Sequence, residues 1–267
     1  MRPGVITEFF DPPLPRVIAH RGGGGDYPEN TLPAFATARA AGVPYIELDV
    51  HMTRDRRVVV AHDDDLKRVG ACAGVIREMT LAELARVDAA YNFATGLDSG
   101  YPFRGQGIRV PELAEVFGAC PEQRFIVEIK QFSPSLVDPL IAVIDRAGMR
   151  RQVLVASEHQ APIDEFRVAA PDLPTNFPTS EVAAFLMSLP PGAPQFTPRG
   201  DAMQIPPEYQ GWKMVTPETV AAARRMGVEI HVWTVNDEAE MRSLLALGVD
   251  GIITDFPARL LHLLALS

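Results

Sequence analysis

The chain has 267 residues, 47% hydrophobic and 22% charged, with a formal net charge of −9. This length suits one large α/β domain, and the acidic balance disfavours nucleic acid and acidic membrane surfaces as partners. Two cysteines are too few for a disulfide framework. Residues 1–16 carry four prolines and two acidic side chains, and no apolar run could span a bilayer. We therefore expect a cytoplasmic protein without stable membrane association.

The first predicted strand is the short apolar run Val17–Ala19, which ends at His20 and Arg21. The four glycines that follow, Gly22–Gly25, allow the backbone to approach a ligand closely, although they match neither a dinucleotide-binding nor a P-loop motif. Asn30 is interpreted as the cap of the helix that comes next.

The most informative stretch is the second predicted strand, which begins at Tyr45. Side chains alternate along a strand, so Glu47 and Asp49 share one face. The chain then turns at Asp55–Arg56 and returns as a β-branched run, which would place Asp49 opposite His62. Because arginine disfavours a positive φ, a longer turn with a different register is the alternative.

The segment from about residue 63 to 110 has a weaker pattern. Thr80 and Glu83 have the spacing of a capping box and predict a short helix. Tyr91–Gly107 is rich in glycine and is predicted to be a long loop on one face of the molecule. We expect the whole segment to be a small loop insertion after the second strand.

From residue 111 onward, strands and helices alternate regularly. This pattern predicts a parallel sheet with right-handed crossovers, and the count of strands predicts a single (β/α)8 TIM-type barrel. We expect one domain over residues 1–267, with its core at about 16–260. The eight strands are predicted near residues 17, 45, 125, 152, 173, 202, 229 and 251.

Polar side chains fall where these strands end, which is where barrels of this kind carry their chemistry. Three carboxylates facing one cavity would require a compensating cation, and oxygen ligands favour Mg²⁺ or Ca²⁺ over zinc. The alternative is an ion-pair network in which basic side chains neutralise the acids. The residues at strand ends are His20, Arg21, Glu47, Asp49, Glu128, Lys130 and Trp233.

Seven motifs, in this order, together resemble the glycerophosphodiester phosphodiesterase family. The resemblance covers residues 17–257. The motifs are H-R-G at 20–22, P-E-N-T at 28–31, E-L-D-V at 47–50, H-D at 62–63, E-I-K at 128–130, W-T-V-N at 233–236 and G-V-D-G-I-I-T-D at 248–255.

This resemblance implies metal-dependent hydrolysis of a small-molecule glycerophosphodiester to glycerol phosphate and an alcohol. It implies one divalent cation, Mg²⁺ or Ca²⁺, and leaves the oligomeric state open. The implied roles are metal ligation by Glu47, Asp49 and Glu128, acid–base catalysis by His20 and His62, phosphate binding by Arg21 and Lys130, and a wall for the glycerol group at Trp233.

Two other functions remain open at this point. A lysophospholipase D or phospholipase C-like enzyme would act on a lipid and should show an exposed apolar rim, for which Tyr91, Phe93, Tyr101 and Phe103 are candidates. A non-catalytic barrel that binds a phosphorylated ligand should have lost a histidine or a carboxylate of the motifs, and this chain retains them all.

Three further residues have a structural interpretation. Asn236 is expected to cap a helix. Trp233 could pack in the core between barrel and helices instead of lining a site. His51 is expected at the rim, because no motif gives it a catalytic role.

Overall fold

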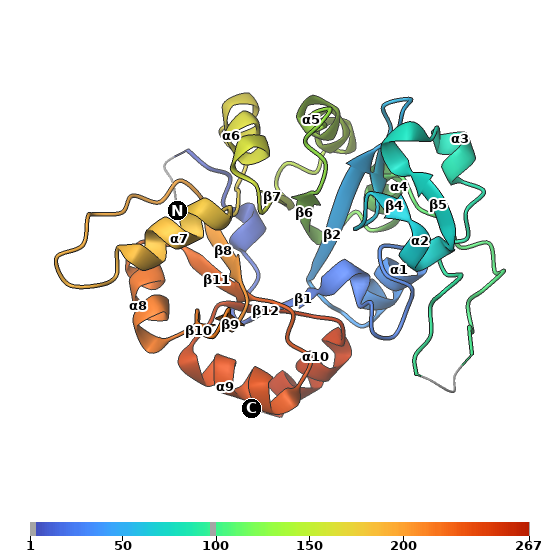
Figure 1. Cartoon of the computed structure of the whole chain (residues 1–267). Coiled ribbons are helices and arrows are strands. Elements are labelled where there is room, and N and C mark those ends of the chain that lie inside the picture. The colour runs from blue at the N-terminus through green and yellow to red at the C-terminus, as the bar shows by residue number, and fades with distance from the viewer. Residues whose placement is uncertain (1–3, 97–99, 267) are drawn as a thin grey trace.

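The computed structural model describes residues 4–96 and 100–266. Seven parallel strands form one curled sheet in the order β7-β6-β2-β1-β12-β11-β8 (Figure 1). These strands are β1 (Arg16–Ala19), β2 (Tyr45–Met52), β6 (Arg124–Ile129), β7 (Val153–Ala156), β8 (Ala202–Ile205), β11 (Glu229–Val232) and β12 (Gly251–Thr254).

The two ends of this sheet are joined by a much shorter segment. Thr175 makes an isolated parallel bridge to Val155 of β7, and Asn176 makes another to Ala202 of β8. The strand expected at Leu173–Phe177 is therefore reduced to two bridges. Pro174 lies within it and has no N–H to donate to a ladder, which limits its pairing. The resulting ring is consistent with a TIM barrel.

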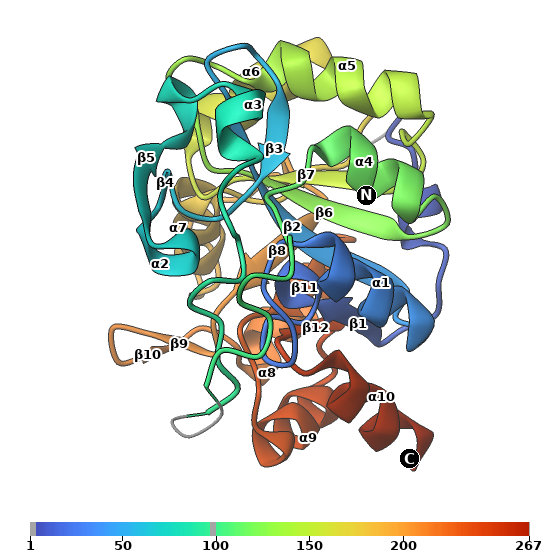
Figure 2. The same ribbon diagram turned by 90° about the vertical axis from the view of Figure 1, so that its right-hand side faces the viewer.

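Helices surround the ring and cover the outward faces of its strands (Figures 1 and 2). The main hydrophobic core lies between the strands and these helices. From β2 it receives three fully buried side chains that point outward from the ring: Ile46, Leu48 and Val50. The helices are α1 (Leu32–Ala40), α4 (Leu113–Ala119), α5 (Val137–Ala147), α6 (Gln160–Ala169), α7 (Thr179–Met187), α8 (Pro217–Arg225), α9 (Glu238–Leu247) and α10 (Pro257–Ala265).

Inside the ring a second apolar cluster separates the two ends of the barrel. It includes Phe9, Ile18, Tyr45 and Ile126. Phe9 comes from the 3-10 helix η1 (Glu8–Phe10), so the N-terminal segment closes the end of the barrel where the strands begin.

The turn after β2 differs from the one that the sequence predicted. Thr53 N donates to Arg57 O at 2.9 Å, which leaves a three-residue turn instead of two residues. Arg56 adopts a φ of +61° in it, a conformation that residues other than glycine rarely take. The longer alternative is therefore the correct one.

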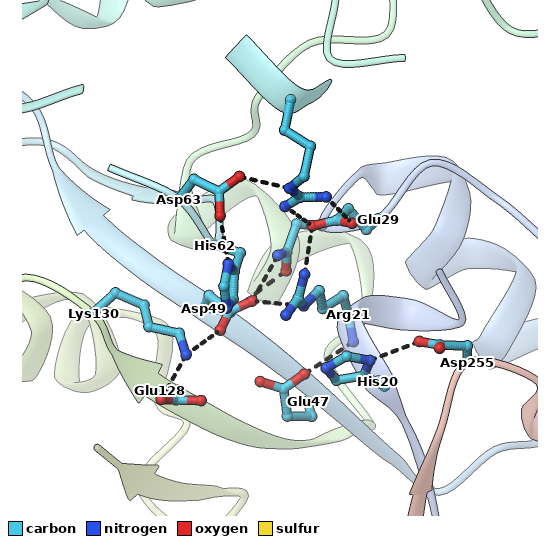
Figure 3. A network of polar contacts seen from close by, with 12 residues as sticks. His20, Arg21, Glu29, Glu47, Asp49, His62, Asp63, Glu128, Lys130 and Asp255 are labelled. Carbon is cyan, nitrogen blue, oxygen red and sulfur yellow. Dashed lines mark hydrogen bonds and ion pairs between the residues drawn. The ribbon is translucent and has the colours of Figure 1, made fainter. Parts of the chain in front are cut away.

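This turn shifts the pairing of β2 with the antiparallel strand β3 (Val58–Val60). Val50 pairs with Val60, and Asp49 O accepts a hydrogen bond from Ala61 N. The expected pairing of Asp49 with His62 is thus wrong by one residue. His62 nevertheless comes close to Asp49, because β3 has ended and strand alternation no longer fixes its side chain (Figure 3).

The chain between β3 and α4 has more regular structure than expected. It contains the antiparallel pair β4 (Asp65–Leu66) and β5 (Cys72–Val75), and the short helices α2 (Lys67–Gly70), η3 (Ile76–Glu78) and α3 (Leu81–Leu84). The capping box at Thr80 is confirmed. Residues 97–99 of the predicted 91–107 loop lie outside the described residues.

Two smaller features complete the described structure. The strands β9 (Glu208–Tyr209) and β10 (Trp212–Lys213) form a hairpin between β8 and α8. None of the helices within residues 4–96 and 100–266 has the length and apolar character that crossing a bilayer requires.

Candidate active site

Three carboxylates converge at the C-terminal ends of two neighbouring strands. Glu47 and Asp49 project from β2, and Glu128 projects from β6, where it is the register partner of Asp49. One oxygen from each lies within 4.8 Å of the others (Figure 3). Glu47 is 5% exposed and Asp49 1%. The structure thus brings together the three carboxylates that the sequence singled out, in a cluster that could hold a cation.

Two basic side chains lie against this cluster. Lys130 Nζ is 2.7 Å from Glu128 Oε1 and 3.4 Å from Asp49 Oδ1. Arg21 Nε is 3.4 Å from Asp49 Oδ2. The ion-pair network weighed as an alternative is therefore present, but it supplies two cations for three carboxylates and cannot neutralise all three in their ionised form.

Glu47 holds its proton more strongly than an ordinary glutamate, because it is buried and because the two basic side chains do not balance three carboxylates. Burial, and next the charge of Asp49, raise the pKa of Glu47 to about 8. Burial also acts on Asp49, but the positive charges of Lys130 and Arg21 outweigh it and hold the pKa of Asp49 below its ordinary value. A buried carboxyl without full compensation beside two further oxygen donors is a donor set that fits a hard divalent cation.

His20 follows β1 in the 3-10 helix η2 (His20–Gly22), and its ring is fixed by a carboxylate. Its Nδ1 lies 2.6 Å from Asp255 Oδ1. Burial lowers the pKa of His20, but the hydrogen bond to Asp255 and the charge of Glu47 outweigh burial, so the pKa is raised. Asn236 in turn donates to Asp255 Oδ2 at 2.7 Å.

His62 has the same kind of support from a different part of the chain. Its Nδ1 lies 2.7 Å from Asp63 Oδ1. His51 Nε2 lies 3.0 Å from the carbonyl oxygen of His62 and thereby helps to fix its backbone. His51 is only 4% exposed, so the expectation of a rim position was wrong.

Both asparagines that were expected to cap helices bind site carboxylates instead. Asn30 donates to Asp49 Oδ2 at 2.8 Å. The residues at the cap positions of α1 and α9 are Thr31 and Asp237, each one place further along the chain. The sequence predicted the two helices correctly, but the predicted capping role of Asn30 and Asn236 was wrong.

Trp233 directly follows β11 and is 43% exposed. The alternative of core packing is therefore wrong for this residue. It lies at the same end of the sheet as the carboxylates, since β11 runs parallel to β12 and, through β1, to β2.

The aromatic residues of the 91–107 loop divide into two groups. Tyr91 and Tyr101 are 39% and 50% exposed. Phe103 packs inward, with its ring centroid 5.4 Å from that of Tyr27 and 5.5 Å from that of Phe93. Tyr27 belongs to the segment between His20 and α1, so this loop is attached to the neighbourhood of the site.

A family model described as the glycerophosphoryl diester phosphodiesterase family matches residues 20–259. The chain belongs to this family. A glycerophosphodiester phosphodiesterase of Caldanaerobacter subterraneus subsp. tengcongensis is 32% identical over 254 residues, covering 92% of this chain and 96% of that protein. The predicted family and the prediction of a phosphodiesterase are confirmed.

Two further proteins are similar to this chain. A lysophospholipase D of Mus musculus is 27% identical over 273 residues, covering 92% of this chain and 85% of that protein. The crystal structure of a glycerophosphoryl diester phosphodiesterase domain from Mycobacterium tuberculosis matches with a TM-score of 0.80 and 24% identity, over 93% of this chain and 99% of that one. The fold is therefore that of known family members.

Proposed function

We propose that the chain hydrolyses soluble glycerophosphodiesters to glycerol phosphate and an alcohol, at a site that binds one divalent cation. The observation that carries this proposal is the convergence of three carboxylates, two buried and one partly buried, beside two histidines, each with a carboxylate on Nδ1. The site sits on what we infer to be one (β/α)8 barrel domain spanning residues 1–267, with the segment from about 63 to 110 as its insertion.

Glu47, Asp49 and Glu128 would hold the cation. When bound, Mg²⁺ or Ca²⁺ supplies positive charge beside the phosphate. The chain's own cations add to it: Lys130 and Arg21 reach Asp49 and face the same space. Arg21 Nε makes no hydrogen bond within the described residues, so this buried N–H has capacity left for a phosphate oxygen.

His20 and His62 would divide the two proton transfers. One removes the proton of the attacking group, which is water or the glycerol hydroxyl beside the phosphate, and the other protonates the leaving alkoxide. If the glycerol hydroxyl attacks, water then opens the cyclic phosphate that results. Because Asp255 and Asp63 each bind a Nδ1, both rings are held with Nε2 as the nitrogen left for proton transfer. The same carboxylates stabilise the imidazolium that forms when a ring accepts a proton. Trp233 would provide an apolar wall for the glycerol group.

A lipid substrate is the second candidate, in the manner of a lysophospholipase D. The exposed rings of Tyr91 and Tyr101 favour it, since they could contact an acyl chain. Against it stands the net charge of −9, which repels anionic lipid surfaces. We therefore propose a soluble small-molecule substrate and a cytoplasmic protein without stable membrane association.

The test is a panel of glycerophosphodiesters and lysolipids, assayed with EDTA and after Mg²⁺ or Ca²⁺ is restored. We expect turnover of the soluble diesters to stop with EDTA and to return with the cation. Glu47→Gln should lower kcat/KM at least about 100-fold, the loss expected when a charge-stabilising group is removed. Its circular dichroism spectrum should be unchanged.

The matched control is Glu78→Gln. It changes an exposed glutamate at the end of η3, which is not among the proposed site residues, and should retain full activity. Full turnover by metal-free enzyme, or by Glu47→Gln, would contradict the metal site. A higher kcat/KM on lysolipid micelles than on any soluble diester would establish the second candidate.

A further inference from the structure

Arg68, in helix α2, joins two carboxylates that come from different parts of the chain. Its Nη1 and Nη2 donate to the two oxygens of Glu29 at 2.6 and 2.7 Å, which is a bidentate contact. Its Nε donates to Asp63 Oδ2 at 2.7 Å. Three segments therefore meet at one guanidinium: the turn before α1, which carries Glu29, the segment after β3, which carries Asp63, and α2.

Each of these carboxylates also holds a residue of the proposed site. Glu29 Oε1 accepts a hydrogen bond from Arg21 Nη1 at 2.8 Å. Asp63 Oδ1 lies 2.7 Å from His62 Nδ1. A continuous chain of bonds thus runs from the proposed phosphate contact Arg21 to the proposed acid–base residue His62, with Arg68 at its centre.

We propose that Arg68 is a positioning residue, which fixes Arg21 and His62 relative to each other by bridging Glu29 and Asp63. This inference rests on the proposed function, because it assigns Arg68 a role in the reaction carried out at that site. No substrate contact is required of Arg68 itself.

The geometry distinguishes this contact from an ordinary surface ion pair. Exposed pairs contribute little, since water screens them and both side chains must be ordered. Here the carboxylates of Glu29 and Asp63 are only 20% and 30% exposed, and each is already held by a second partner. A planar guanidinium offers donors in a fixed fork and can serve both carboxylates at once. An ammonium group is a point charge and cannot reproduce that fork.

Without Arg68, two negative groups would face each other with no cation between them. Asp63 could then turn away from His62, and Glu29 could turn away from Arg21. We expect Arg68→Ala to lower kcat/KM on glycerophosphocholine with Mg²⁺ by roughly 10- to 100-fold, as for other residues that orient a site through an intermediate group. The neighbouring Lys67→Ala is the matched control, because the exposed Lys67 ammonium has Asp65 as its one ion-pair partner among the described residues, and its loss should leave activity unchanged.

Two measurements separate positioning from simple charge or folding. Arg68→Lys keeps the charge and should recover less than half of the lost activity. Guanidinium at tens of millimolar should raise the rate of Arg68→Ala several-fold through the half-exposed position of the missing side chain, whereas sodium at equal ionic strength should not. A misfolded variant would show no such rescue.

The results also separate this inference from the proposed function. A wild-type enzyme that fails to cleave glycerophosphodiesters in the presence of Mg²⁺ or Ca²⁺ overturns the proposed function itself. An active wild type together with Arg68→Ala within twofold of it overturns the positioning role alone. Full recovery by Arg68→Lys also overturns it, because charge without the fork would then suffice.

Discussion

At the scale of single residues, each histidine of the site is oriented by a carboxylate of its own. His20 and His62 carry the proposed chemistry, and Asp255 and Asp63 orient them. The sequence identified the histidines because they end predicted strands or stand in a motif. It did not reveal that the carboxylate of Asp63 binds His62. Nor did it reveal that Asp255, the last residue of the final motif, binds His20 from 235 positions along the chain.

The roles of the histidines can be tested by single substitution. We expect His20→Ala and His62→Ala each to reduce kcat by about 10²- to 10⁴-fold, the usual effect of losing a general acid or base. The double variant should lose less than the product of the two, since the pair acts as a unit. His262→Ala, which alters an exposed histidine on α10, is the control.

A substrate with a p-nitrophenolate leaving group then distinguishes acid from base, because this group needs little protonation. The variant that lacks the acid should recover much of its rate, and the one that lacks the base should not. Recovery by neither variant would contradict the division of roles, and one histidine would then serve only to orient the phosphate.

At the scale of elements, the alternation of strands and helices was predictable from the sequence, whereas the geometry of individual turns and links was not. The strands at Tyr45 and Arg124 were predictable from their apolar residues, and the helix α5 was predicted at 135–147. The β2–β3 register was not, because it depends on Arg56 accepting a positive φ that its side chain disfavours. The link at Thr175–Asn176 was predicted as a full strand because apolar content does not reveal how much pairing Pro174 removes.

The 91–107 loop offers a test of substrate choice at this scale. Phe103 packs against Tyr27, which lies outside the loop, and against Phe93 of the same loop. Phe103→Ala should release the loop and change the ratio of kcat/KM between lysolipids and soluble diesters by about 10-fold, a typical effect of an altered pocket contact. The concentration of Mg²⁺ or Ca²⁺ that gives half-maximal activity should stay the same.

Tyr101→Phe is the control for that experiment, since it keeps the exposed ring on which Arg104 stacks at 3.6 Å from the centroid. An unchanged substrate ratio in Phe103→Ala would show that this loop does not govern specificity. A changed cation requirement with an unchanged ratio would place its influence on the carboxylates instead.

At the scale of the whole molecule, the closed end of the barrel is held by an ion pair that is largely buried. Arg16 is 2% exposed, and its Nε lies 2.6 Å from Glu229 Oε2. The same guanidinium donates to Tyr45 Oη at 2.6 Å, within the apolar cluster inside the ring. This arrangement lies at the opposite ends of β1 and β11 from His20 and Trp233, so it supports the barrel without taking part in the site.

The ion pair makes stability depend on pH in a defined range. Burial raises the pKa of Glu229, but hydrogen bonds from Arg16 and His231 outweigh burial and lower it to about 2, from an ordinary value of 4.5. Because the folded-state pKa is depressed, this stability is present above pH 4.5 and is lost as the pH falls towards 2. Glu229→Gln should therefore cost on the order of 3 kcal/mol of unfolding free energy at pH 7.

Urea unfolding at a series of pH values provides the measurement. The gap between wild type and Glu229→Gln should narrow as the pH falls from 4.5 to 2. Glu238→Gln, an exposed position on α9, should run parallel to wild type throughout. A gap that stays constant with pH would mean that packing, and not the charge of Glu229, accounts for the difference.

The short link at Thr175–Asn176 also makes the pairing between neighbouring strands uneven around the ring. β2 and β6 share six register pairs and carry all three carboxylates, whereas β7 and β8 are joined through Thr175 and Asn176, each of which makes one isolated bridge. Local opening begins where few backbone bonds must break, so the amide protons of Thr175 and Asn176 should exchange with solvent before those that join β2 to β6. The link can therefore open locally while β2 and β6 keep the three carboxylates in register.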